Sequence, residues 1–230
     1  MKDLRPMRNQ RLIPYRVLLP SVLAATFLAE PVAHAQTAPT NGDAREFSGS
    51  QAKGMAWLID ENLQHDPGSP VLGNPQGDVT LVEFFDYRCP YCKIMAPVVA
   101  ALIASDPKLR VVMKEYPVLS SQSIVAAKAA LVAAKNGKYA AFHSAMFALK
   151  GPFDEPRILS VAQSVGLDPA RVRQEMDAPD IATELQINIA LGKALDFRGT
   201  PTFLVDGHII AGAVAAGELR KLIAAARTKD

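Results

Sequence analysis

The sequence VTLVEFFDYRCPYC occupies residues 79–92 and holds both cysteines of the 230-residue chain, Cys89 and Cys92. Its first half is an apolar run of the strand type, and the pattern after Cys92 is typical of a helix. The pair therefore lies where a strand gives way to a helix N-terminus, and Pro90 suits the first turn because its missing N–H would have no partner there. The unpaired amides and the macrodipole at that place favour a thiolate, the form of cysteine that attacks disulfides.

Three other interpretations of the cysteine pair compete with dithiol redox chemistry. A structural disulfide would close a very small ring and contribute only about 2 kcal/mol through unfolded-chain entropy. A structural zinc ion usually has four ligands, but the sequence has no second Cys-x-x-Cys and its four histidines are scattered. Two inert buried thiols are the third interpretation. Redox chemistry is favoured, and the sequence predicts neither a metal nor a cofactor.

Residues 1–35 have the pattern of a secretory signal peptide, with five basic residues, an apolar stretch over 17–29 and an Ala-x-Ala site that ends at Ala35. The apolar stretch is short for a membrane span, which needs about 20 residues. We therefore expect cleavage near Ala35 and a periplasmic location, where disulfides persist. Removing the signal takes five basic and two acidic residues from totals of 25 and 23, which leaves 20 and 21. The net positive charge thus belongs to the signal, and no nucleic-acid partner is predicted.

The rest of the pattern predicts an α/β fold. Strands are expected at 79–85, 109–116, 202–205 and 208–210, the last two joined by an Asp-Gly turn, and a final helix at 218–227. Between the second and third strands the pattern is helical, with Gly and Pro at intervals. We expect a leader over 36–69 that could hold a short helix at 55–64, a core from 70–118 and 199–230, and an inserted helical subdomain over 119–198.

Three motifs resemble the DsbA family of periplasmic thiol–disulfide oxidoreductases. They are the stretch 82–92, the segment Gly199-Thr200-Pro201-Thr202-Phe203, and the terminal hairpin with its helix, so the resemblance spans roughly residues 70–228. It implies a thioredoxin fold interrupted by a helical domain. The segment 73–80 is also similar to the subgroup related to copper-tolerance thiol proteins, some of which oligomerise through an N-terminal stalk.

The position on the helix assigns Cys89 as the attacking thiol and Cys92, one turn deeper, as the resolving thiol. Glu83 is an acid within an otherwise apolar strand, and it aligns with the family's buried acid. The resemblance therefore implies that burial raises the pKa of Glu83, which would exchange a proton with Cys92. The core is expected to include Phe84, Phe85 and Phe203.

The resemblance also implies that Thr200 and Pro201 form a cis-proline loop facing the redox pair, and that clients contact this loop together with Pro90 and Tyr91. Threonine before the proline is closer to isomerase-type relatives, since DsbA proper usually has valine there and histidine where Tyr91 stands. Two roles, client contact and ordinary solvation in a loop, stay open for Asp86, Tyr87 and Arg88.

The predicted function is disulfide exchange with unfolded or reduced secreted proteins. We favour a largely monomeric oxidase that a quinone-linked membrane partner keeps oxidised. The alternative is an isomerase or reductase, kept reduced by an electron-donating membrane partner and oligomerised through residues 44–64. Two weaker alternatives are a Cu(I)-handling thiol protein, because soft thiolates select Cu(I), and a peptide-binding chaperone without redox chemistry.

Overall fold

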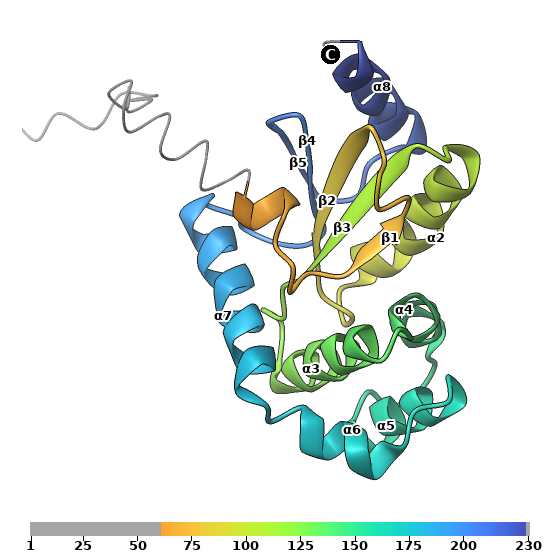
Figure 1. Cartoon of the computed structure of the whole chain (residues 1–230), viewed down its shortest axis with the longest axis vertical. Coiled ribbons are helices and arrows are strands. Elements are labelled where there is room, and N and C mark those ends of the chain that lie inside the picture. The colour runs from red at the N-terminus through yellow and green to blue at the C-terminus, as the bar shows by residue number, and fades with distance from the viewer. Residues whose placement is uncertain (1–60, 229–230) are drawn as a thin grey trace, which may run out of the picture. The chain divides into compact units, whose positions relative to one another are not determined.

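A five-stranded mixed sheet forms the centre of the computed structural model, which describes residues 61–228 (Figure 1). The strand order is β1-β3-β2-β4-β5, with β2 and β3 parallel and the other neighbours antiparallel. The strands are β1 (Val71–Gly73), β2 (Val79–Phe85), β3 (Leu109–Glu115), β4 (Thr202–Val205) and β5 (His208–Ala211). The parallel pair is joined through helix α2 (Pro90–Ser105), since parallel strands need a crossover rather than a tight turn.

Both faces of the central strands are buried, which explains why β2 and β3 have almost no polar alternation. On one face, Phe85 and Met113 pack with residues of α2 and of α8 (Ala216–Arg227). On the other face, Phe84 and Val112 pack with residues of α7 (Pro179–Ala194). The sheet therefore lies between two helical layers, and the expected burial of the three phenylalanines, which include Phe203, is confirmed.

Five helices fill the stretch that the sequence predicts to be helical. They are α3 (Ser121–Lys135), α4 (Tyr139–Ala148), α5 (Glu155–Ser164), α6 (Pro169–Glu175) and α7. Side chains cap three of them at the N-terminus, where Ser120, Asp154 and Asp168 each accept a backbone N–H three residues on. Helix α3 contributes many fully buried alanines, so the neighbouring helices can approach it closely. The described residues group as one compact unit, and the predicted subdomain boundaries stay a prediction.

The expected α/β class is confirmed, with small differences at the edges. Strand β1 was not predicted, because three residues are too few to show alternation, and it pairs antiparallel with β3. Strand β3 ends one residue earlier than expected, β5 one residue later, and α8 begins at Ala216 rather than at residue 218. Residues 61–64 are helical. The predicted signal peptide and the rest of the leader up to residue 60 lie outside the described residues.

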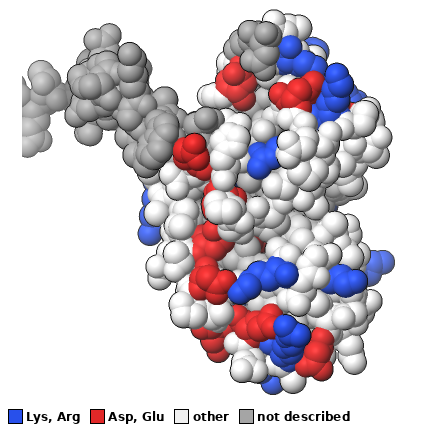
Figure 2. Space-filling model, viewed as in Figure 1, with Lys and Arg blue, Asp and Glu red and all other residues white. Residues whose placement is uncertain are grey.

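Charge is unevenly spread over the molecule. On the face shown in Figure 2, acidic side chains gather on the side of α7, whereas the surface over β1, α2 and α4 is mostly uncharged. Within residues 61–228, no helix has both the length and the apolar composition that a membrane crossing requires. The same residues contain no cluster of three or more His, Cys, Asp or Glu side chains suited to a metal ion.

Candidate active site

Cys89 is the N-cap of α2, and Pro90 is the first residue of the helix. The sequence placed Cys89 on the helix itself, which is wrong by one residue, because the backbone of Cys89 is extended and the helical turn starts at the fixed φ of the proline. An N-cap side chain still lies beside the unpaired N–H groups of the first turn. Both cysteines are free thiols, with Cys89 5% exposed and Cys92 fully buried.

The Thr200–Pro201 loop faces the cysteine pair, although it lies more than a hundred residues further along the chain. The thiol of Cys89 donates a hydrogen bond to the backbone carbonyl of Thr200, with 3.1 Å between the sulfur and the oxygen. The Thr200–Pro201 peptide bond is cis, as the family resemblance implied. The loop immediately precedes β4, which pairs with β2, so the central sheet fixes the loop relative to the start of α2.

Cys92 lies one helical turn further in and is the more deeply buried thiol. Desolvation by burial raises the pKa of Cys92, and the negative charge of Glu83 acts in the same direction. The Thr200 side chain opposes this shift, because its hydroxyl can donate to the Cys92 thiolate. The Thr200 hydroxyl oxygen is buried and has no hydrogen-bond partner among residues 61–228, so it is available to a thiolate.

Glu83 lies in the middle of β2 with only 2% of its surface exposed. Burial raises the pKa of Glu83 to about 8, and its Oε2 atom has no hydrogen-bond partner within the described part of the chain. A carboxyl group with this pKa is largely protonated at neutral pH and can still release its proton. The expected burial and raised pKa of this acid are confirmed, and its role in proton exchange with Cys92 stays a prediction.

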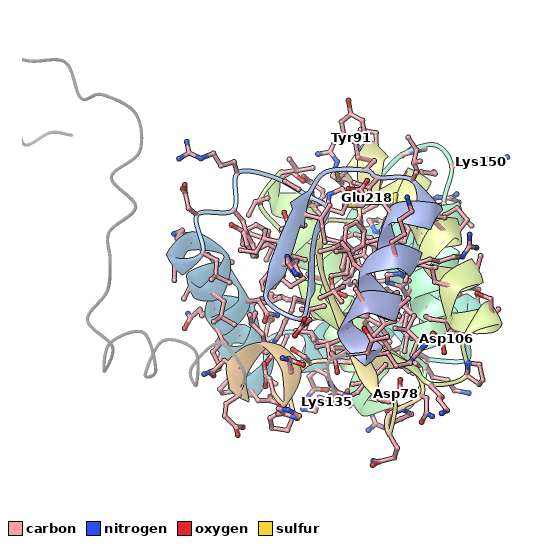
Figure 3. All side chains as sticks on the ribbon, turned by 90° about the horizontal axis from the view of Figure 1, so that it is seen from above. Asp78, Tyr91, Asp106, Lys135, Lys150 and Glu218 are labelled. Atoms are coloured by element: carbon pink, nitrogen blue, oxygen red, sulfur yellow. The ribbon has the colours of Figure 1, made fainter. Side chains whose placement is uncertain are left out.

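Pro90 and Tyr91 directly follow Cys89 and are both exposed, and their contact with clients stays a prediction. Tyr91 is 58% exposed and projects away from the protein in Figure 3. Ile94, which follows on α2, is 59% exposed. The start of α2 thus exposes two large apolar side chains beside the thiols, together with the charged Lys93.

The three residues before Cys89 differ in their surroundings. Asp86 and Tyr87 are buried, at 2% and 5% exposed, so neither of the two roles left open for them, client contact or solvation, is correct. The sequence could not show this, because polar residues in a loop usually face water. Arg88 is exposed, and its guanidinium carbon lies 5.9 Å from the centre of the Phe153 ring.

A buried polar cluster behind the active-site loop was not predicted from the sequence. Tyr87 and Tyr139 both donate to Glu115 Oε1, at 3.3 and 2.9 Å, and the hydroxyl of Tyr87 lies 3.2 Å from Nδ1 of His143. Burial raises the pKa of Glu115 well above its usual value and lowers the pKa of His143 to about 4. The cluster joins the loop before Cys89 to helix α4. Glu115, an acid at the buried end of β3, was the sequence feature that could have indicated this cluster.

A comparison with models of protein families identifies the family of this chain. A model described as a DSBA-like thioredoxin domain matches residues 80–224. The chain belongs to that family. The matched range includes both cysteines, Glu83 and the Thr200–Pro201 loop, so the DSBA-like family covers the whole candidate site.

The descriptions of individual relatives are consistent with the family assignment. A thioredoxin-like oxidoreductase from Silicibacter pomeroyi has a solved structure with a TM-score of 0.71 and 42% identity, which covers 73% of this chain and 97% of that one. ScsC from Proteus mirabilis has a TM-score of 0.70 and 26% identity, covering 78% and 81%. The thiol:disulfide interchange protein DsbA of Bordetella parapertussis is 25% identical over 207 residues, which cover 88% of each chain.

Other relatives are much longer than this chain. The Na(+)/H(+) antiporter NhaA 1 of Salinispora arenicola is 29% identical over 154 residues, which make up 66% of this chain and 24% of the antiporter. The chain therefore spans about a quarter of the length of the first curated relatives that it matches.

Proposed function

We propose that this member of the DSBA-like family is a periplasmic thiol–disulfide oxidoreductase that acts on secreted proteins, with Cys89 and Cys92 as its redox pair. The observation that carries the proposal is the placement of the two cysteines at the start of α2, where the Cys89 thiol meets the Thr200 carbonyl. No cofactor is needed, because the electrons pass between sulfur atoms.

In the oxidising direction, a client thiolate attacks Cys89 Sγ of the Cys89–Cys92 disulfide. The client–Cys89 bond forms as the Cys89–Cys92 bond breaks, and the electron pair stays on Cys92. A second client thiolate then attacks the client sulfur of this mixed disulfide and releases Cys89 as a thiolate. The client loses two electrons and the pair gains them, and a quinone-linked membrane partner would remove them again.

In this scheme, Glu83 is the proton donor to Cys92. The high pKa that burial gives Cys92 means that its thiolate takes up a proton readily, and Glu83 holds a proton at neutral pH. In the reverse direction, Glu83 would accept the proton of Cys92 as the resolving thiolate forms. Thr200 supports this step, because its hydroxyl can donate to the Cys92 thiolate.

Trapping experiments test the division of labour between the thiols. In a Cys92→Ala variant, Cys89 still attacks client disulfides but the mixed disulfide is not resolved, so covalent complexes with periplasmic proteins should accumulate on non-reducing gels. Cys89→Ala should trap few clients, because its remaining thiol is fully buried. Equal trapping by the two variants would show that the helix position does not assign the roles.

The favoured direction is oxidation by a largely monomeric protein. The alternative, an oligomeric isomerase, is supported by Thr200 before the cis-proline and by the uncharged Tyr91. Light scattering combined with refolding of scrambled ribonuclease separates the two. A monomer that oxidises reduced ribonuclease but does not unscramble it supports the oxidase. A stable trimer that unscrambles the client, and loses both properties when residues 36–64 are deleted, would establish the isomerase.

A further inference from the structure

The attacking thiol is carried by a tight turn of the main chain. The backbone N–H of Cys89 donates to the carbonyl of Asp86 at 3.0 Å. This bond makes residues 86–89 a β-turn with Tyr87 and Arg88 at its centre. The Asp86 carboxylate also accepts the N–H of Arg88 at 2.8 Å, which stiffens the turn. Since Cys89 is both the last residue of this turn and the N-cap of α2, a group that anchors the turn also places the attacking sulfur.

The side chain of Tyr87 anchors this turn to the rest of the protein. Its hydroxyl donates to Glu115 Oε1 at 3.3 Å and lies 3.2 Å from Nδ1 of His143. A tyrosine has one hydroxyl hydrogen, so the Tyr87 oxygen can accept from His143 while it donates to Glu115. The buried ring packs edge-on against Phe85, with 5.0 Å between the ring centres. Tyr87 is therefore fixed at both its ring and its hydroxyl.

Glu115 is the part of this anchor that belongs to the central sheet. It is the last residue of β3, and in the register of the parallel pair it lies opposite Phe85, two residues before Tyr87. Its Oε1 atom also accepts the hydroxyl of Tyr139, which comes from α4, at 2.9 Å. One carboxyl oxygen thus receives a hydroxyl from the active-site turn and another from a helix.

An acid is a costly residue at this place. Glu115 is 1% exposed, and no Lys or Arg within residues 61–228 forms an ion pair with it. Burial raises the pKa of Glu115 well above its usual value, so the group is neutral at neutral pH. A buried carboxyl group still costs free energy that an apolar side chain would not, so hydrophobic packing does not explain it. Its oxygen does, because the two buried hydroxyls need an acceptor.

We propose that Glu115 is a positioning residue for the attacking thiol and that it acts through Tyr87. Tyr87, held by this oxygen, fixes the turn that presents Cys89 to the first N–H groups of α2 and to the Thr200 carbonyl. A sulfur at a helix start is stabilised in its reduced, charged form, so correct placement makes the Cys89–Cys92 pair a better oxidant. The inference rests on the proposed function, because its consequence is measured on that pair.

The test is the redox equilibrium of the pair with glutathione, measured by alkylation of the free thiols. Tyr87→Phe keeps the ring but removes the hydroxyl, and Glu115→Met removes the acceptor oxygen. Each should lower the equilibrium constant for reduction of the pair by glutathione about fivefold, the effect of losing one buried hydrogen bond. The double variant should change it little further, because both substitutions break the same contact. An unchanged constant in Tyr87→Phe would overturn the proposal.

Tyr139→Phe is the matched control, because it removes the shorter hydroxyl contact from the same oxygen but leaves the turn untouched. It should lower stability to urea without shifting the glutathione equilibrium, and a shift equal to that of Tyr87→Phe would refute the positioning role. Glu115→Gln retains an acceptor oxygen and should stay near the wild-type constant, whereas a shift as large as that of Glu115→Met would contradict the proposal.

The outcomes separate this role from the proposed function. If Glu115→Met does not fold, the two tyrosine variants decide, since each keeps its aromatic ring. A wild-type protein whose cysteine pair does not exchange with glutathione would refute the proposed function and this role with it. Normal exchange in the wild type, with equal constants in Tyr87→Phe and Tyr139→Phe, would refute the positioning role alone.

Discussion

Two polar side chains, one from a strand and one from a loop, act on Cys92. Glu83 belongs to β2 and Thr200 to the loop before β4, and each has a buried oxygen without a hydrogen-bond partner among the described residues. A buried polar atom without a partner costs free energy in the folded protein. We interpret both atoms as groups whose partner is the Cys92 sulfur at a particular stage of the exchange.

Replacement of Glu83 by Gln should change both stability and rate. The folded-state pKa of Glu83 is about 8, against 4.5 for the unfolded chain, so the wild-type protein loses stability as the pH rises from about 4.5 to 8. Glu83→Gln removes this loss, which amounts to about 3 kcal/mol at pH 7. Urea unfolding of the reduced protein at pH 5 to 8 measures it, and a variant that keeps the wild-type slope would contradict the assignment. Disulfide exchange should be slower at neutral pH.

Thr200→Val should slow the step in which Cys92 acts as a thiolate. Valine matches threonine in shape but removes the hydroxyl that can donate to the sulfur. Because a hydrogen bond to a charged group contributes about 1.5–3 kcal/mol, we expect a loss of roughly tenfold in the resolution of a glutathione mixed disulfide, measured by rapid quenching. Thr200→Ser retains the hydroxyl and is the control, and equal rates in the two variants would rule out a role for the hydroxyl.

The packing of α7 on the sheet depends on one glycine. A Cβ atom at Gly192 would lie 2.5 Å from Cε2 of Tyr116, the residue that follows β3. The Tyr116 ring is packed in the core and cannot shift aside as the end of a flexible side chain can. The helix would therefore have to move away from the sheet. Gly192 therefore allows α7 to lie close to the sheet on the face opposite the cysteines.

Gly192→Ala should lower the free energy of unfolding by about 1–3 kcal/mol, the range for overpacked cores. Alanine is the better helix former, so propensity alone predicts the opposite sign. Gly217→Ala in α8 is the matched control, because nothing lies within 4 Å of a Cβ atom there, and it should be neutral or stabilise by up to about 1 kcal/mol. Urea denaturation of both variants gives the comparison, and a stabilised Gly192→Ala variant would refute the close approach.

At the scale of the whole molecule, a buried polar network that includes Lys114 ties three segments together. Lys114 in β3 is fully buried and forms an ion pair with Asp66 at 2.7 Å. The Ser69 hydroxyl lies 2.8 Å from Oε1 of Glu184, and the same oxygen accepts the amide of Asn188 at 3.1 Å. The segment before β1, the central sheet and helix α7 are thereby linked through polar groups that have little contact with water.

Lys114→Met should destabilise the protein by about 3 kcal/mol, because it leaves a partly buried carboxylate without its cation. Lys128→Met is a matched control, since its partner Asp177 is largely exposed and such pairs contribute less than about 1 kcal/mol. Thermal unfolding of the two variants at neutral pH is the measurement. Similar small shifts in both would mean that the Lys114 ion pair does not hold the segments together.

The sequence by itself determined the elements whose signals are local. Four such signals are visible within short windows, because strand and helix periodicity arise from neighbouring residues. They are the apolar run of β2, the start of α2 to within one residue, the Asp-Gly turn between β4 and β5, and the alanine-rich α3. The burial of Glu83 was expected only through the family resemblance, because a charged side chain in an apolar strand is otherwise placed where it can reach water.

The tertiary structure alone decided which distant groups meet. The Thr200 carbonyl reaches the Cys89 thiol across 111 positions, and Asp86 finds the amides of Val118 and Leu119 across 32 and 33. Glu115, Tyr87 and Tyr139 meet in the same way, as does the short strand β1 with β3. These contacts form only when the sheet brings separate segments together. Periodicity along the chain arises from neighbouring residues and therefore cannot predict them.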